Sequence, residues 1–174
     1  MRTILRKLGS DDGVEILEAA LVLPLLFTFL LGIVWFGRAF NIYSTITQAA
    51  QQGAIAAARP SCATCGNTFA NNGAVDTTVS TVLQASSLDP AQIPTNASAP
   101  NPPTCPGGAG CTTTTHKITV CRNVQLNPTA GATQPLQCGT IVSFQYPFNS
   151  YLPFTSLNLQ TVTMTAQAQN RMEN

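Results

Sequence analysis

The sequence has few charged residues, and their scarcity excludes one class of partner. Asp, Glu, Lys and Arg make up 9% of the 174 residues, compared with about 25% in ordinary soluble domains. After residue 59 the charged residues are three acids and three bases: Asp76, Asp89, Glu173, Lys117, Arg122 and Arg171. This region is therefore neutral and lacks the basic patch that nucleic-acid binding needs. We expect no nucleic-acid partner.

Residues for catalysis are also scarce. His116 is the only histidine, and one unaccompanied imidazole supports neither a Ser-His-Asp nor a Cys-His arrangement. The three acids after residue 59 are too scattered to predict a pair of catalytic carboxylates, and no glycine-rich phosphate loop is present. We therefore expect a protein that is not an enzyme, with no metal and no other cofactor.

A long apolar run near the N-terminus is the strongest feature present. Residues 19–37, "AALVLPLLFTFLLGIVWFG", contain one Thr and nearly match the roughly 20 residues that span a bilayer as a helix. The bases Arg2, Arg6 and Lys7 precede the run, which predicts a cytoplasmic N-terminus and an exported remainder. The alternative is a secretory signal peptide cut near Gly37-Arg38-Ala39, but this run exceeds the usual 7 to 15 residues.

The apolar pattern continues beyond the membrane run as a helix over residues 14–59, which Pro60 ends. We predict a cytoplasmic leader over 1–13, this helix with its transmembrane part at 19–37, and an exported domain over 60–174 with loops at 60–73 and 89–115. The outer half of the helix carries one apolar face, which packs on the protein's own sheet, on neighbouring subunits, or on both. That face consists of Phe36, Phe40, Tyr43, Ile46 and Ala50.

The exported part is expected to have an α+β fold. Val75, Val79 and Leu83 have helical spacing and predict a short helix near 74–88. Alternating segments near 116–122, 139–148 and 157–168 predict three antiparallel strands covered by the long helix. A change of frame between Leu159 and Val162 indicates a β-bulge.

The six cysteines all follow the membrane run, which predicts disulfides formed in an oxidising compartment. Six cysteines allow 15 connectivities. We predict one disulfide between successive strands and two within local loops: Cys121–Cys138, Cys105–Cys111 and Cys62–Cys65.

The segment "CATC", which contains Cys62 and Cys65, has other interpretations. A redox pair belongs at a helix start after a strand, and a zinc site needs a second close pair. The segment instead follows a helix and Pro60, which favours a structural disulfide. Asn96 begins a weak match to a glycosylation sequon.

The N-terminal segment resembles a known family. "GVEILEAALVLPLLFTFLLGIVWFGRAF" is similar to the N-terminal signature of TadE-like proteins, pseudopilins of the tight-adherence pilus machinery in the type IV pilin superfamily. Gly13, then Glu18 at the fifth position after it, and then a long apolar helix carry this resemblance. The chain departs from many pilins at Val14, where they have Phe or Met, and at the adjacent Glu15.

The resemblance implies that a prepilin peptidase cuts between Gly13 and Val14. Glu18 would pair with the new ammonium group of a neighbouring subunit, which gives a use to a carboxylate that costs about 2.5 to 3.5 kcal/mol in a membrane helix. Pro24 would kink or locally melt the helix near Ala20. The implied partners are the membrane, the peptidase and other pilin or pseudopilin subunits, with self-assembly into filaments included.

The implied function is structural, in pilus assembly, adhesion or secretion at the bacterial inner membrane, and minor components and major filament subunits need the same helix. Two alternatives stay open. One is a single-pass anchored, exported binding protein, and the other is an exported redox protein that uses Cys62 and Cys65.

Overall fold

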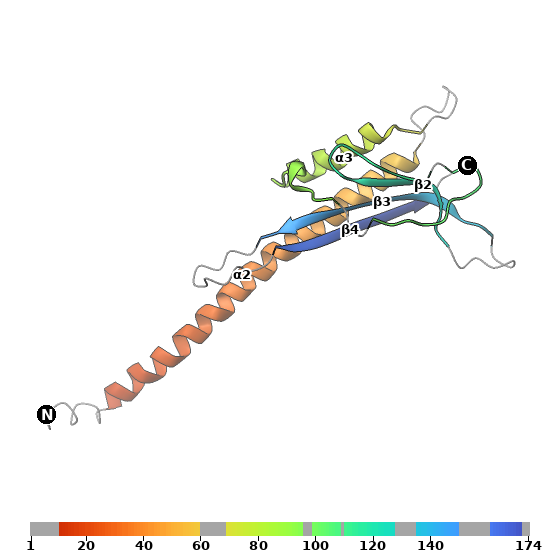
Figure 1. Ribbon diagram of the computed structural model, residues 1–174. Coiled ribbons are helices and arrows are strands. Elements are labelled where there is room, and N and C mark those ends of the chain that lie inside the picture. Colours follow the sequence, from red (N-terminus) through yellow and green to blue (C-terminus); the bar gives the residue numbers. More distant parts are fainter. Residues whose placement is uncertain are drawn as a thin grey trace. The chain divides into compact units, whose positions relative to one another are not determined.

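The computed structural model describes residues 11–59, 69–95, 99–108, 110–127, 135–149 and 161–171. The chain divides into two compact units, Met1–Phe40 and Asn41–Asn174. Helix α2, Asp11–Ala58, contributes to both units (Figure 1). It begins three residues earlier than the predicted helix over 14–59, so the last residues of the predicted leader are helical. No part of α2 is interrupted, which agrees with a long apolar helix.

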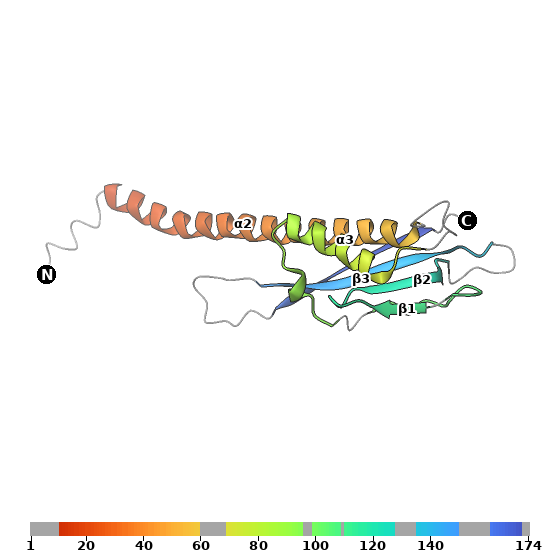
Figure 2. The same cartoon turned by 90° about the horizontal axis from the view of Figure 1, so that it is seen from above.

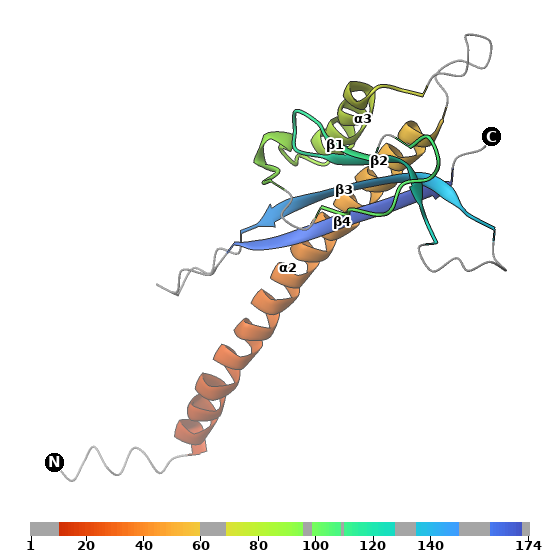
Figure 3. The same cartoon turned by 45° about the vertical axis from the view of Figure 1, so that its right-hand side comes forward.

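The second unit contains an antiparallel sheet whose four strands follow one another in chain order (Figure 3). Its strands are β1 Gly110–Thr113, β2 Thr119–Gln125, β3 Cys138–Phe148 and β4 Val162–Arg171. The sheet and the helices confirm the predicted α+β class, but the expected number of three strands was too low. β1 lies within the expected loop 89–115.

β1 has no alternating apolar pattern, which explains why the sequence did not predict it. Its residues are Gly-Cys-Thr-Thr, and it pairs with β2 through a tight hairpin in which Thr114 N donates to Ile118 O at 2.8 Å. Lys117 has a φ of 59° in that turn, a left-handed conformation without a glycine to signal it. Strand pairing here depends on the turn and on Cys111 rather than on a hydrophobic face.

The C-terminal part of α2 and the shorter helix α3, Asn72–Ala85, both contribute to the main core beside the sheet (Figure 2). The Asn71 side chain caps α3 by accepting from Ala74 N at 2.7 Å. A 3-10 helix, η2 Pro90–Gln92, follows. The main core includes small residues of α2, valines of α3 and large residues of β3: Ala49, Ala50, Ala54, Val75, Val79, Val142 and Phe144.

Gly53 allows α2 to approach α3 and β3 closely. A Cβ at this position would lie 2.6 Å from Val79 Cγ2 and 3.3 Å from Val142 Cγ1. Cβ atoms in proteins do not lie as close as 2.6 Å to another carbon atom. A residue larger than glycine at position 53 would therefore not fit at the present distance between α2 and α3.

A second, smaller cluster is formed by Cys121, Val124 and Ile141. β3 is consequently buried along nearly its whole length, instead of alternating between a buried and an open face. The register of β2 against β3 shifts between Cys121 and Val124, where Asn123 has a φ of 49°. The bulge predicted between Leu159 and Val162 falls largely outside the described residues.

Candidate functional site

The predicted processing and assembly residues lie in the first turns of α2. Val14 and Glu18 are four residues apart, which places them about 6 Å apart along the axis and on one side of the helix. Both side chains are exposed. Gly13 is part of the same helical segment. The helix therefore presents Glu18 outward, in the position that a contact with another molecule needs.

Pro24 lies inside α2. A proline cannot donate the backbone hydrogen bond to the residue four positions earlier, here Ala20. The helix nevertheless continues through this position without a break, so the local melting expected near Ala20 is absent from this structure. A role for Pro24 in assembly stays a prediction.

Residues 19–37 of α2, within the first unit, are apolar around the whole circumference of the helix. Among the described residues, α2 is the helix that is long and apolar enough to cross a membrane, and its most apolar window has no buried residue. Large side chains such as Leu21, Phe29, Ile33 and Phe36 are more than half exposed. A helix that is apolar on every side needs an apolar environment, which a bilayer or a bundle of other helices supplies.

The apolar face predicted over residues 36–50 divides into two parts. Ile46 and Ala50 are fully buried in the core of the second unit. Phe36, Phe40 and Tyr43 remain 76%, 64% and 51% exposed. The C-terminal part therefore packs in the protein's own core, as one interpretation predicted, and packing of the N-terminal part on neighbouring subunits stays a prediction.

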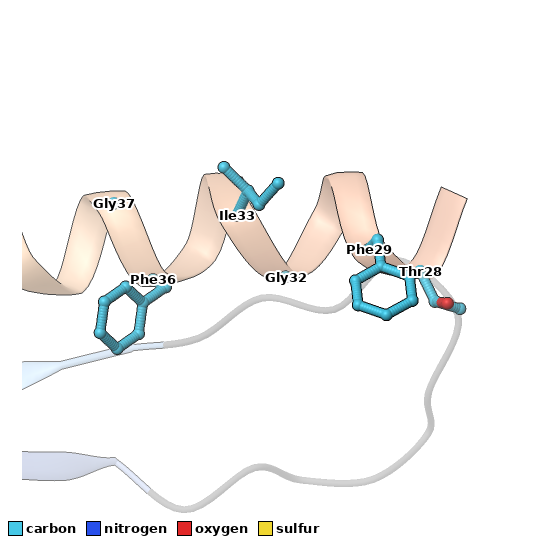
Figure 4. Close-up of a pocket in the computed structure, with 6 residues that line it drawn as sticks. All are labelled: Thr28, Phe29, Gly32, Ile33, Phe36 and Gly37. Atoms are coloured by element: carbon cyan, nitrogen blue, oxygen red, sulfur yellow. The ribbon is translucent and has the colours of Figure 1, made fainter. Parts of the chain in front are cut away.

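A shallow apolar groove of about 560 Å³ follows the exposed helix. Figure 4 shows Phe29 and Phe36 on the same side of α2 as Gly32, which lies between them. Thr28, Ile33 and Gly37 complete the lining. Sequence reasoning missed this groove, although the glycine at position 32 between two phenylalanines was a usable signal.

The predicted transmembrane part ends at an aromatic and a cationic side chain. The Arg38 guanidinium carbon lies 6.0 Å from the centre of the Trp35 ring, within the range of a cation–π contact. Tryptophan and arginine together are typical of a membrane–water interface. The outer end of the span at residue 37 stays a prediction.

The predicted disulfide pairing was wrong for the four described cysteines. The structure has Cys105–Cys138 and Cys111–Cys121 instead of Cys121–Cys138 and Cys105–Cys111. Cys62 and Cys65 lie outside the described residues, so their pairing stays a prediction.

Strand register explains the observed pairing. Cys121 lies opposite Cys111 on one side and opposite Ile141 on the other. Ile141 is three residues from Cys138, or about 10 Å along the strand, which is too far for a disulfide. Thr104 pairs with Val124, and this bridge brings Cys105 to the start of β3, where Cys138 lies.

The polar contacts of the second unit connect its elements to one another. Asp76 of α3 accepts from Thr114 Oγ1 at 2.7 Å and lies 2.8 Å from His116 Nδ1, which attaches the β1–β2 turn to α3. Within the described residues no group of three His, Cys, Asp or Glu side chains is arranged to hold a metal ion.

Arg122 of β2 makes a second connection. Its guanidinium donates to Ala57 O at 2.7 Å, to Ala70 O, and to Asn72 Oδ1 at 3.2 Å. Burial lowers the pKa of Arg122. The side chain thus joins the end of α2 to the start of α3, a structural role that its sequence position did not reveal.

Residues 13–54 match the family model described as TadE-like protein. The chain carries a TadE-like domain. The match confirms the resemblance predicted from the sequence. Neither the curated proteins nor the solved structures give a significant match to this chain.

The TadE-like domain covers the helix from Gly13 to Ala54. It includes Glu18, the groove around Gly32 and the first small residues that pack on the sheet, whereas the strands lie outside it. A TadE-like domain on an exposed apolar helix fits a pilus-related, membrane-anchored subunit, and the TadE-like family is a structural family of pilus assembly.

Proposed function

We propose that this chain is a TadE-like pseudopilin, or a pilin-related filament subunit, that serves pilus assembly, adhesion or secretion. One observation carries the proposal: the TadE-like domain coincides with a helix that exposes both its apolar surface and Glu18. An exposed apolar surface of this length is stable in a bilayer before assembly and in a bundle of helices afterwards.

The proposed mechanism begins with cleavage by a prepilin peptidase between Gly13 and Val14 at the cytoplasmic side of a bacterial inner membrane. Cleavage creates an ammonium group on Val14. The Glu18 carboxylate of a neighbouring subunit pairs with that ammonium, because a charge in an apolar environment is tolerated when it has a partner. The exported unit, with its disulfides, then lies on the outer side of the assembly.

Processing is tested by producing the full chain with and without its cognate prepilin peptidase and by measuring its mass. We expect a peptidase-dependent N-terminus at Val14, and we expect Gly13→Ala to block it. A chain that keeps residues 1–13 in the presence of an active peptidase contradicts the proposal. It would favour the alternative of a single-pass anchored binding protein.

The role of Glu18 is tested in the same cells. We expect Glu18→Ala to be exported and processed but to lose at least tenfold in sedimentable assemblies, because the ammonium of the next subunit then has no partner. Glu15→Ala is the matched control, since Glu15 is an exposed acid one turn earlier. Equal losses in both variants would contradict a specific pairing role for Glu18.

A further inference from the structure

β1 is an edge strand with few contacts to hold it on the sheet. Within the described residues its four residues pair with β2 alone, and Thr112 and Thr113 are exposed. Cys111 is the β1 residue that packs against a buried cluster, the smaller one around Cys121. The entropy lost in ordering four residues roughly cancels what their backbone hydrogen bonds contribute. The disulfide of Cys111 is therefore the strongest contact of β1.

That disulfide joins residues that lie directly opposite each other on β1 and β2, Cys111 and Cys121. Cys121 is fully buried, whereas Cys111 is half-buried. Thiol–disulfide exchange begins when a thiolate attacks one sulfur, so it depends on access to that sulfur. Cys111, on the edge strand, is the member of the pair that an attacking thiolate approaches from solvent.

The β1–β2 hairpin also makes two polar contacts with α3. Asn72 Nδ2 donates to Thr112 Oγ1 at 2.6 Å, and Thr114 Oγ1 donates to Asp76 at 2.7 Å. The first of these contacts starts from β1 itself and the second from the turn that follows it. Neither is apolar, so neither replaces the hydrophobic face that β1 lacks.

The position of β1 matters because β1 covers one side of β2. β2 lies between β1 and β3 in the sheet and is buried over most of its length. If β1 left the sheet, the backbone N–H and C=O groups of β2 that now face β1 would lose their partners. An edge with unpaired backbone groups is a template for pairing with another chain.

We propose that the Cys111–Cys121 disulfide is a redox-sensitive switch. In the oxidised state it holds β1 against β2, and in the reduced state β1 separates and uncovers the edge of β2. The reductant is a dithiol, by chemical class. The main core does not contain either cysteine, so it stays folded when this disulfide opens. This inference goes beyond the proposed function and does not depend on it.

The reduction transfers two electrons from the dithiol to the disulfide. One thiolate of the dithiol attacks Cys111 Sγ, which forms a mixed disulfide and releases Cys121 as a thiolate that takes up a proton. The second thiol of the reagent then attacks the mixed disulfide and releases Cys111 as a thiol. The dithiol ends as a disulfide, and the two cysteines end as thiols.

Hydrogen exchange of the full chain in detergent micelles, with and without dithiothreitol, tests the switch. After treatment and alkylation, we expect modified Cys111 and Cys121. We expect the amides of residues 110–118 to exchange at least tenfold faster, because β1 no longer pairs with β2. Amides of residues 46–57, in the part of α2 that belongs to the main core, should change less than twofold.

Two double variants assign the effect to one disulfide. Cys105→Ser/Cys138→Ser should keep slow exchange at residues 110–118 until dithiothreitol is added. Cys111→Ser/Cys121→Ser should exchange rapidly there from the start and should not respond to the reagent.

Three results would overturn the switch. One is alkylation of both cysteines without faster exchange at residues 110–118. Another is a Cys111–Cys121 disulfide that stays closed to dithiothreitol while the unit is folded. The last is equal loss of protection at residues 46–57, because reduction would then unfold the whole unit. None of these results bears on processing at Gly13 or on the role of Glu18, so the proposed function is tested separately.

Discussion

The two parts of α2 have opposite exposure, although they belong to one continuous helix. Residues 19–37 are apolar on all sides and mostly exposed, whereas the part from Asn41 buries one face of small residues and keeps Gln51 and Gln52 exposed. An amphipathic segment can complete a core with its own chain, but a uniformly apolar segment cannot. We therefore expect a different environment to stabilise each part, the protein's own core for the second and lipid or other helices for the first.

Loss of a disulfide should affect the second unit alone. Cys105–Cys138 joins residues 33 positions apart, and removal of a crosslink of that size by Cys105→Ser/Cys138→Ser should lower the free energy of unfolding by about 4 kcal/mol. Denaturation of the full chain in detergent micelles, followed by near-ultraviolet circular dichroism, measures this change. Membrane association of the chain should be unchanged.

Cys111→Ser/Cys121→Ser is the matched control for the first disulfide. The two cysteines are 10 positions apart, so the expected loss is smaller, about 3 kcal/mol. If either double variant also released the chain from membranes, the two parts of the molecule would not be independently stabilised.

The disulfides also mark a limit of sequence-based prediction. Periodicity correctly predicted the long helix, α3 and three of the strands, because each of these has a hydrophobic face. The pairing of Cys111 with Cys121 depends on β1, whose four residues have no such face. Without that strand, the register that separates Cys121 from Cys138 could not be deduced.

The relative placement of the candidate site residues was easier to predict than the fold of the second unit. Gly13, Glu18 and the apolar run are contiguous in sequence, so their arrangement follows from helix geometry alone. The connections made by Arg122 and by Asp76 with His116 join residues 38 to 65 positions apart. Such contacts depend on the packing of α3 against the sheet, which sequence spacing does not specify.

An arginine placed at two exposed positions of α2 tests which environment surrounds each part. Leu30 is 58% exposed and Gln52 is also exposed. Leu30→Arg should lower membrane insertion by about 2.5 to 3.5 kcal/mol, roughly a hundredfold, because a charge is costly in the middle of a membrane helix. Flotation of membranes from cells that produce the full chain measures the inserted fraction.

Gln52→Arg is the matched substitution in the second part of the helix. It should change stability by less than about 0.5 kcal/mol and leave insertion unchanged, because that position faces water. Equal tolerance of arginine at both positions would mean that the first part of α2 does not lie in lipid, and the comparison between the two parts would fail.

The same change of glycine to alanine should also have different effects in the two parts. Gly53→Ala forces a Cβ against Val79 and Val142, and this overpacking should lower the free energy of unfolding by about 1 to 3 kcal/mol. Gly37→Ala introduces a Cβ that meets nothing within 4 Å and should leave the unfolding of the second unit unchanged. Denaturation of the full chain in detergent micelles compares the two variants, and a similar loss in both would contradict the packing assigned to Gly53.

Alkaline pH should produce the smallest effect, again in the second unit. Burial raises the pKa of Tyr146, while its hydrogen bond with the Asp89 backbone partly opposes that rise. The unfolded chain ionises its tyrosines near pH 10, so stability is complete below that pH and decreases as pH rises toward the folded pKa. Tyr146→Phe should remove this decrease in short denaturation measurements between pH 9 and 11, whereas Tyr43→Phe, at an exposed position of α2, should not. If both variants kept the full alkaline dependence, ionisation of Tyr146 would not be its cause, and the effect would have to arise elsewhere in the chain.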